Sequence, residues 1–296
     1  MMTILISGIT GFVGKNLQKY LHDNQYTVKK INRNEDIDSS GFEAIIHLAG
    51  KAHDLKNVSR PEEYYEVNTE LTKKIFDAFL ASEAMVFITL SSVKAVADST
   101  DEILTEDTIP NPLTHYGKSK LMAEEYILKN LPGNKRVYIL RPCMIHGVGN
   151  KGNLTLLYNF VKKGIPYPLA AFDNKRSFLS IDNLCFIVKE LIEGGDIPSG
   201  VYNVADDGPL STSRVVEILS QSTGKSARLW KVPKKVVFFF ASIGDILKLP
   251  LGKERLFKLT ENYVVSNSKI KTAIRKPLPL NSEEGLLITA KSFQDA

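Results

Sequence analysis

Cysteine is scarce in this chain of 296 residues, where only Cys143 and Cys185 occur. Both stand within apolar runs, which argues against a disulfide framework and favours a reducing compartment. The segment that follows Met1 lacks the basic, apolar and small-residue pattern of a signal peptide. We therefore expect a cytoplasmic protein in which both thiols are small core side chains.

Long hydrophobic runs are also missing. The most apolar stretch, "VVFFFASIGDILKLPL" from Val236, is interrupted by Gly244, Asp245 and Lys248. It falls well short of the roughly 20 apolar residues that a helix needs to span a bilayer. We interpret it as a core or interface helix rather than a membrane contact, and no membrane insertion is predicted.

Neither a charge block nor a metal motif stands out. The net charge is +5, with Lys and Arg dispersed among Asp and Glu, so no basic block of the kind that binds nucleic acid or anionic lipid is visible. The five His residues show no metal-ligand spacing, and neither Cys-x-x-Cys nor His-Glu-x-x-His occurs. We predict no nucleic-acid partner and no metal, while the modest positive charge suits an anionic substrate or cofactor.

The first half of the chain alternates short β-rich runs with helical patterns. The strand-like runs are "TILIS", "YTVKKI", "AIIHLA", "MVFITLS" and "RVYILR", and "KNLQKYLHD", "TELTKKIFDAFL" and "KLMAEEYILKN" are helical. This alternation predicts βαβ units and an α/β fold with a doubly wound parallel sheet of Rossmann type. Near Asn150 the regular alternation of strand-like and helical runs ends. We place a Rossmann domain at 1–163 and a smaller, partly interleaved α/β substrate domain at 164–296, with segments near 177–205 returning to the first domain.

The run "ILISGITGFVGKNLQKYL" places Gly8, Gly11 and Gly14 between the first predicted strand and a helix. In a dinucleotide fold the first glycine permits a tight turn, and the second lets the backbone approach a pyrophosphate. The third allows the helix to pack closely on the strand. The phosphates then lie at the positive end of the helix. This context predicts a nucleotide site.

The second predicted strand ends in Asn32 and Arg33, where NAD-preferring proteins usually carry an acidic residue for the ribose hydroxyls. Arg33 is suited to the 2′-phosphate of NADP, which favours NADP(H) and leaves NAD(H) open. The alternative interpretation is that Arg33 is a solvated loop residue.

A tyrosine followed four residues later by a lysine occurs three times, at Tyr26, Tyr116 and Tyr158, so the spacing alone decides nothing. Only Tyr116 follows a strand that ends in hydroxyls, "FITLSSVKA". Hydride transfer between an alcohol and a ketone requires a proton to move at the oxygen. A phenol can move that proton when an ammonium on the same helical face, here Lys120, stabilises the phenolate. Ser92, at the end of the adjacent strand, would hold the substrate oxygen.

Six motifs occur in one order: "GITGFVG", "AIIHLAG", "ITLSSVKA", "HYGKSK", "LRPCMIHGVG" and "KRSFLSIDN". Over most of the chain they resemble the extended short-chain dehydrogenase/reductases, the NAD-dependent epimerase/dehydratase family, in its nucleotide-sugar branch. The resemblance implies that Ser92, Tyr116 and Lys120 are catalytic. Asn68 matches an asparagine that opens a helix near the cofactor, with a plain helix cap as the alternative. The cofactor contacts that the resemblance implies are Gly8, Thr10, Gly11, Phe12, Val13, Arg33, Leu48, Ala49, Gly50, Asn68, Tyr116 and Lys120.

The resemblance also implies a substrate side formed by Ser92, Lys94, Asn153 and Arg176. Arg176 matches an arginine that binds the nucleotide diphosphate, for which a planar guanidinium is suited. Asn153 matches an asparagine near that diphosphate, and Lys94 either approaches the substrate or is a solvated lysine beyond the strand. The implied partner is a nucleotide sugar, UDP-linked, and related enzymes often form homodimers through the Tyr/Lys helix.

Two departures from the family pattern narrow the range of reactions that we expect this chain to catalyse. Val93 and Lys94 stand where 4,6-dehydratases carry the Asp and Glu that perform elimination, which disfavours dehydration. Val96 and Ala97 replace the Tyr-Gly pair of many epimerases. The forms "SSVK" and "LAGKAHD" are more similar to bacterial reductases of polysaccharide synthesis, and Arg33 suits an enzyme that consumes NADPH at each turnover.

We therefore expect an NAD(P)-dependent nucleotide-sugar oxidoreductase that reduces the 4-keto group of a UDP-4-keto-6-deoxy-N-acetylhexosamine, with Tyr116 as general acid. One alternative is a UDP-hexose 4-epimerase that uses tightly bound NAD. An alternative of another class is an NADP-binding redox sensor. Such sensors typically lose the tyrosine or the lysine, whereas this chain keeps Tyr116 and Lys120.

Overall fold

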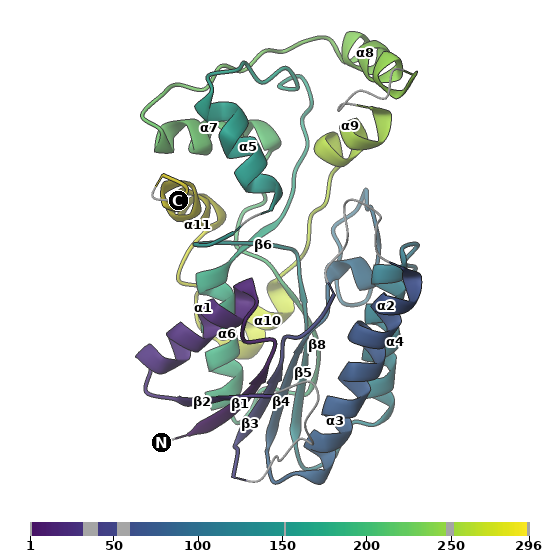
Figure 1. Cartoon of the computed structure of the whole chain (residues 1–296), viewed down its shortest axis with the longest axis vertical. Helices are drawn as coiled ribbons and strands as arrows, with labels where there is room; N and C mark the ends of the chain where they lie inside the picture. The colour runs from purple at the N-terminus through teal and green to yellow at the C-terminus, as the bar shows by residue number, and fades with distance from the viewer. Residues whose placement is uncertain (1, 32–40, 52–59, 151, 247–251, 295–296) are drawn as a thin grey trace.

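The computed structural model of the chain describes residues 2–31, 41–51, 60–150, 152–246 and 252–294. Within these residues, the centre is a parallel sheet of six strands in the order β2-β1-β3-β4-β5-β8 (Figure 1). The strands are β1 (Thr3–Ser7), β2 (Thr27–Lys30), β3 (Ala44–His47), β4 (Val86–Leu90), β5 (Arg136–Pro142) and β8 (Gly200–Val204). The predicted doubly wound α/β fold is confirmed, and each of the strand-like runs in the first half forms a strand.

Helices cover both faces of the sheet because the side chains of each strand alternate between two apolar cores. Ile4 and Ile6 of β1 share a core with Leu17 and Leu21, whereas Leu5 belongs to the core on the other face. The first face carries α1 (Phe12–Asp23), α6 (Ile181–Glu193) and α10 (Ser268–Ile274) (Figure 1). The second carries α2 (Pro61–Tyr65), the π-helical turn η1 (Glu66–Glu70), α3 (Leu71–Ala81) and α4 (His115–Lys129).

A second lobe stands above the carboxyl ends of the strands in Figure 1. It contains the strand pair β6 (Met144–His146) and β7 (Phe178–Ser180), with α5 (Asn153–Lys162), α7 (Thr212–Ser222), α8 (Lys234–Ile246), α9 (Lys253–Thr260) and α11 (Ser282–Ser292). Its helices share an apolar core of their own, in which Leu154, Val216 and Leu286 are buried. The chain returns to the sheet between β7 and α7, where it forms α6 and β8.

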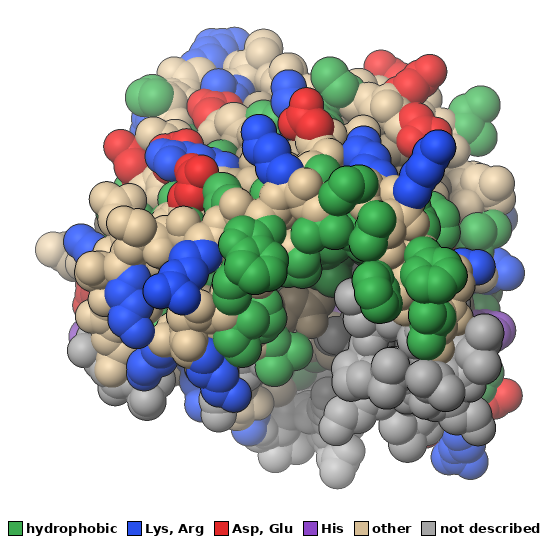
Figure 2. Space-filling model, turned by 90° about the horizontal axis from the view of Figure 1, so that it is seen from above, with side chains coloured by type: hydrophobic (Ala, Val, Ile, Leu, Met, Phe, Trp, Pro, Cys, Tyr) green, Lys and Arg blue, Asp and Glu red, His purple; other side chains and the backbone are tan. Residues whose placement is uncertain are grey.

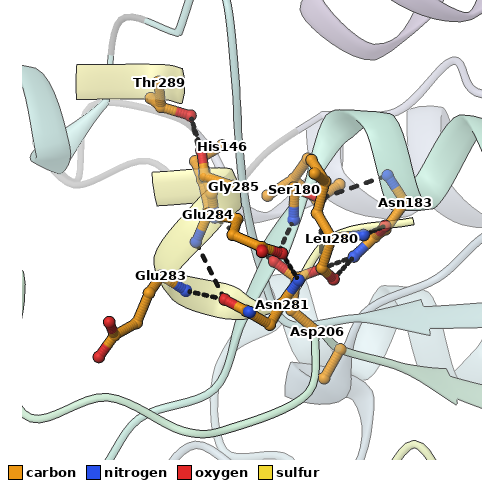
Figure 3. Close-up of polar contacts among 12 residues, drawn as sticks. His146, Ser180, Asn183, Asp206, Leu280, Asn281, Glu283, Glu284, Gly285 and Thr289 are labelled. Atoms are coloured by element: carbon orange, nitrogen blue, oxygen red, sulfur yellow. Dashed lines mark hydrogen bonds and ion pairs between the residues drawn. The ribbon is translucent and has the colours of Figure 1, made fainter. Parts of the chain in front are cut away.

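A buried polar network joins the lobe to the sheet (Figure 3). Asp206, which follows β8, accepts hydrogen bonds from the backbone N of Ser180 at 2.8 Å and from Nδ2 of Asn183 at 2.7 Å. His146 Nδ1 lies 2.8 Å from Thr289 Oγ1 of α11. Burial raises the pKa of Asp206 to about 6 and lowers that of His146 to about 4. At neutral pH the side chain of Asp206 is therefore a buried carboxylate, which Ser180 and Asn183 hold where β7 meets α6. The contact between His146 and α11 lies beside it.

Residues 236–246 of the apolar stretch lie in α8, and among the side chains that are described one side of this helix enters a core. Val237 and Ala241 are buried, whereas Phe239 and Phe240 are exposed. Among the helices of the described residues, none has the length and the apolar content required to cross a bilayer.

Candidate active site

The carboxyl ends of the parallel strands meet at one edge of the sheet, below the second lobe. The strand order reverses between β1 and β3, which is where α/β folds of this kind bind their ligands. A cavity of about 240 Å³ at this edge brings together the three predicted catalytic residues, Ser92, Tyr116 and Lys120. Its lining comes from the ends of β3, β4 and β5 with the loops that follow them, from β6 and from α4: Leu48, Gly50, Lys51, Leu90, Ser91, Ser92, Tyr116, Lys120, Pro142, Cys143 and Ile145.

The glycine loop between β1 and α1 has the close packing expected of a phosphate cradle. Gly8 has a φ of +74°, and a Cβ there would lie 2.5 Å from the backbone N of Ala49. A Cβ on Gly14 would lie 2.3 Å from the carbonyl oxygen of Gly8, so α1 packs directly on the end of β1. Gly11 caps α1 without a side-chain hydrogen bond, which leaves N–H groups of the first turn for an anion. These residues fit a dinucleotide pyrophosphate.

Replacing Gly14 with alanine is expected to lower the free energy of unfolding by about 1–3 kcal/mol, because the methyl group overlaps backbone atoms of the loop. Gly11→Ala is the matched control, since its Cβ would approach the Gly8 carbonyl no closer than 3.3 Å. We expect Gly11→Ala to melt like the parent protein and to bind NADP(H) more weakly. Thermal unfolding measures the change in stability, and a cofactor titration measures the change in affinity. If Gly14→Ala and the parent melt at the same temperature, α1 does not pack on the loop as closely as described.

Ser92 and Tyr116 face each other in the cavity. Ser92 follows β4 and caps the short 3-10 turn η2 (Val93–Ala95), where its hydroxyl accepts a hydrogen bond from the N of Lys94 at 3.2 Å. Burial raises the pKa of Tyr116, and a side-chain hydrogen bond with Ser92 lowers it by less. Tyr64 of α2 lies edge-on to Tyr116, with 6.2 Å between the ring centroids, and raises this pKa again. Tyr116 is therefore a protonated phenol at neutral pH.

Lys120 lies one helical turn after Tyr116 on α4 and is buried. Its Nζ donates a hydrogen bond to the carbonyl of Leu90 at 2.8 Å, and burial lowers its pKa to about 8. A side-chain hydrogen bond with Ser92 lowers the pKa of Tyr116, and the expectation that Lys120 lowers it as well stays a prediction. The Nζ of Lys120 would lie 3.1 Å from a Cβ on Gly50. The ammonium therefore stands beside the loop after β3, where cofactor contacts are expected.

Asn68 lies inside the π-helical turn η1 and is not a helix cap. Its Oδ1 accepts a hydrogen bond from the N of Lys51 at 2.8 Å, and its Nδ2 donates to the Lys51 carbonyl at 3.1 Å and to Ser119 Oγ at 3.0 Å. Ser119 donates in turn to the carbonyl of Tyr116 at 2.8 Å. Turns of this kind are frequent at functional sites. Asn68 ties the loop after β3 to the helix that carries Tyr116 and Lys120.

Two buried residues behind the cavity, Glu124 and Arg141, were missed in the sequence. Glu124 of α4 accepts hydrogen bonds from Arg141 of β5 through Nε at 3.0 Å and Nη2 at 2.5 Å, and Ser91 Oγ donates to the same carboxylate. The side chains of Glu124 and Arg141 are 2% and 5% exposed. The pair holds α4 against the sheet and so positions Lys120, one turn before Glu124. The spacing of Lys120 and Glu124 on one helix face was the available signal, but it does not reveal a partner on a strand.

Two of the residues assigned to the substrate side, Lys94 and Arg176, lie beside Tyr263. Arg176 is half-buried, and its Nη2 lies 3.9 Å from Oε1 of Glu261. Lys94 is half-buried, with its Nζ 4.2 Å from the ring centroid of Tyr263, so it is not a solvated lysine. Asn153 is exposed at the start of α5. These three side chains are outside the lining of the cavity described above.

Most of the remaining expected cofactor contacts lie on two loops at the sheet edge and on the first turn of α1: Thr10, Gly11, Phe12, Val13, Leu48, Ala49 and Gly50. Arg33 lies outside the described residues. The preference for NADP(H) over NAD(H) therefore stays a prediction.

Comparison with known proteins defines the class to which this fold and site belong. Residues 4–205 match the model of the NAD dependent epimerase/dehydratase family, and the chain belongs to this family. It is 31% identical to the UDP-glucose 4-epimerase of Vibrio cholerae, over 99% of this chain and 96% of that protein. It is 26% identical to the N-acetyl-alpha-D-glucosaminyl-diphospho-ditrans,octacis-undecaprenol 4-epimerase of Escherichia coli O157:H7, over 90% of this chain and 84% of that protein.

Solved structures agree with this classification at the level of the fold. The structure of RMD from Pseudomonas aeruginosa, complexed with NADPH, matches with a TM-score of 0.75 over 100% of both chains, at 19% identity. The resemblance inferred from the motifs is confirmed, and the chain is an NAD(P)-dependent enzyme of the epimerase and reductase type. The alternative of a non-enzymatic redox sensor is set aside.

Proposed function

We propose that this protein reduces the 4-keto group of a UDP-4-keto-6-deoxy-N-acetylhexosamine, with NADPH as the source of hydride. The observation that carries the proposal is Tyr116, a protonated phenol that is hydrogen bonded to Ser92 in the cavity. Reduction of a ketone consumes a proton at the oxygen, so the resting form of this acid is the form that the reaction needs. Val93 and Lys94 beside Ser92 supply no carboxylate for an elimination.

The residues of the chain take distinct roles in this proposal. NADPH, when bound, supplies a hydride to the carbonyl carbon. Ser92 holds the carbonyl oxygen through its hydroxyl, and Tyr116 gives its proton to that oxygen as the new C–H bond forms. The phenolate of Tyr116 then takes a proton from solvent. Lys120, beside Gly50, holds the cofactor ribose, and Arg176 pairs with the diphosphate of the substrate.

A UDP-hexose 4-epimerase with tightly bound NAD is the second candidate. It is supported by the 31% identity, over almost the whole chain, to the UDP-glucose 4-epimerase of Vibrio cholerae. In that reaction Tyr116 first accepts the proton of the 4-hydroxyl group. Val96 and Ala97 stand where many epimerases carry a Tyr-Gly pair, which disfavours this assignment. The reductase therefore remains our first proposal.

Incubation of the protein with a UDP-4-keto-6-deoxy-N-acetylhexosamine and NADPH is expected to consume the two in equal amounts, since each reduction uses one hydride. Loss of NADPH absorbance and mass analysis of the sugar measure the ratio. NADH in place of NADPH is the control for cofactor preference and should support slower turnover if Arg33 contacts the 2′-phosphate. Interconversion of UDP-hexoses without net cofactor consumption would show an epimerase instead.

A further inference from the structure

The outer side of α8 exposes aromatic side chains at the end of the molecule opposite the sheet (Figure 1). Val236, Phe239 and Phe240 follow the i, i+3, i+4 spacing of one helical face, and the two phenylalanines are 63% and 62% exposed. Phe257 of α9 is 57% exposed, and Trp230, on the segment that leads into α8, is 59% exposed. We name these five side chains, with the basic residues between 225 and 235, the α8 surface.

The opposite side of α8 anchors the helix. Val237 and Ala241 are buried in the core of the second lobe. Phe238 packs against Phe172 and against Phe257 of α9, with 6.0 Å and 5.8 Å between the ring centroids. The exposed aromatics are therefore presented by a fixed helix, and exposed apolar groups that gather in this way mark interaction surfaces.

Basic residues lead into α8 and begin it, and Asp245 follows near its end. The sequence from 218 to 244 contains no Asp or Glu and five exposed basic residues, Lys225, Arg228, Lys231, Lys234 and Lys235. The chain as a whole has 38 basic and 33 acidic residues, so its mixed composition conceals this stretch. Figure 2, which looks onto this end of the molecule, shows hydrophobic side chains gathered together, with Lys and Arg beside them and some Asp and Glu farther out.

The surface of an anionic lipid bilayer matches both the exposed aromatic side chains and the basic residues of the α8 surface. Aromatic side chains enter the boundary between headgroups and acyl chains, while adjacent Lys and Arg side chains are attracted to the lipid phosphates. A second copy of the chain matches poorly, because a two-fold interface centred on α8 would bring two sets of cations together. The stretch from 218 to 244 carries no acidic side chain to compensate them.

We propose that the α8 surface docks this protein on the surface of an anionic lipid bilayer. Phe239 and Phe240 enter the headgroup layer, and Lys231, Lys234 and Lys235 lie at the lipid phosphates. The docking is peripheral, and it does not depend on which reaction the site catalyses.

The docking surface is linked to the active site by a short segment. Helix α9 ends at Thr260, and Tyr263 donates a hydrogen bond from its Oη to the carbonyl of Ala97 at 2.7 Å. Ala97 follows the turn η2 that Ser92 caps. The segment after α9 thus reaches the turn beside Ser92. Because α8 and α9 lie at the far end of the second lobe, a docked bilayer would lie at that lobe, away from the sheet (Figure 1).

Co-sedimentation of the full chain with vesicles tests the proposal. The parent protein is expected to bind vesicles of equal parts phosphatidylglycerol and phosphatidylcholine, and to bind less as salt is added. The double variant Phe239→Ser/Phe240→Ser is expected to bind about tenfold more weakly or worse. Lys234→Glu/Lys235→Glu, which changes exposed side chains outside the core, is expected to lose binding to a similar extent.

The matched control is Ile103→Ser/Ile109→Ser, which removes two isoleucines that are 61% and 87% exposed elsewhere on the molecule. It should bind vesicles as the parent does, and every variant should keep the parent turnover on a substrate in solution. Failure of the parent to bind anionic vesicles, or equal binding by all variants, overturns the proposal. A parent dimer that becomes monomeric in Phe239→Ser/Phe240→Ser, measured by sedimentation velocity without lipid, also overturns it, because a second copy then covers the surface.

Discussion

A Tyr116→Phe variant is expected to lose turnover by about 10²–10⁴-fold, the usual contribution of a positioned general acid, while it binds NADP(H) as the parent does. The substitution removes one oxygen atom from a ring that keeps its edge contact with Tyr64. The substrate oxygen then loses the proton donor that stands beside Ser92. Initial rates of NADPH oxidation and a fluorescence titration with the cofactor measure the two quantities.

Tyr64→Phe is the matched control, because it removes the phenol oxygen of the neighbouring ring and should leave turnover nearly unchanged. The pH dependence is a second readout. Burial raises the pKa of Tyr116 and lowers that of Lys120 to about 8, so the protonated phenol persists through neutral pH and the parent rate should first fall near pH 8, as Lys120 loses its charge. A Tyr116→Phe enzyme with the parent rate would exclude Tyr116 from the proton transfer.

Glu124→Ala is expected to lower the free energy of unfolding by about 3–5 kcal/mol, the usual cost of removing one partner from a buried ion pair. The side chain of Arg141 is 5% exposed, and its guanidinium would lose the carboxylate that accepts from Nε and Nη2. Ser91 would lose the acceptor of its hydroxyl as well. Chemical denaturation followed by circular dichroism measures the loss.

Glu125→Ala is the matched control, since Glu125 is the next residue of the same helix and is exposed. Its expected effect is within about 0.5 kcal/mol, as for most surface substitutions. Glu124→Gln keeps an acceptor for Arg141 and should lose less stability than Glu124→Ala. If Glu124→Ala and Glu125→Ala unfold at the same denaturant concentration, the buried pair does not hold α4 on the sheet.

Local pattern was sufficient to predict the sheet and the glycine loop. A buried parallel strand needs apolar side chains on both faces, and runs such as 44–49 show this directly. Gly8 and Gly14 were recognisable because each lies where a Cβ would overlap backbone, at 2.5 Å and 2.3 Å. Such requirements act within a few residues, so they leave a mark in the sequence itself.

Contacts between segments that lie far apart in the chain left no comparable pattern in the sequence. Asn68 was open to interpretation as a helix cap, and it holds the backbone of Lys51 from inside a π-helical turn. Glu124 meets Arg141 only because α4 lies against β5. The effect of Lys120 on Tyr116 could not be deduced from a four-residue spacing, since the direction of each side chain depends on what surrounds it.

The sequence by itself determined that this chain forms a doubly wound dinucleotide fold of the epimerase/dehydratase family, because strand, glycine and helix requirements are local and recur in order. Only the tertiary structure buried Tyr116 and placed its hydroxyl in a hydrogen bond with Ser92. It likewise decided that α8 buries Val237 and exposes Phe239. Burial and ionisation depend on which distant segments surround a group, and folding alone brings those segments together.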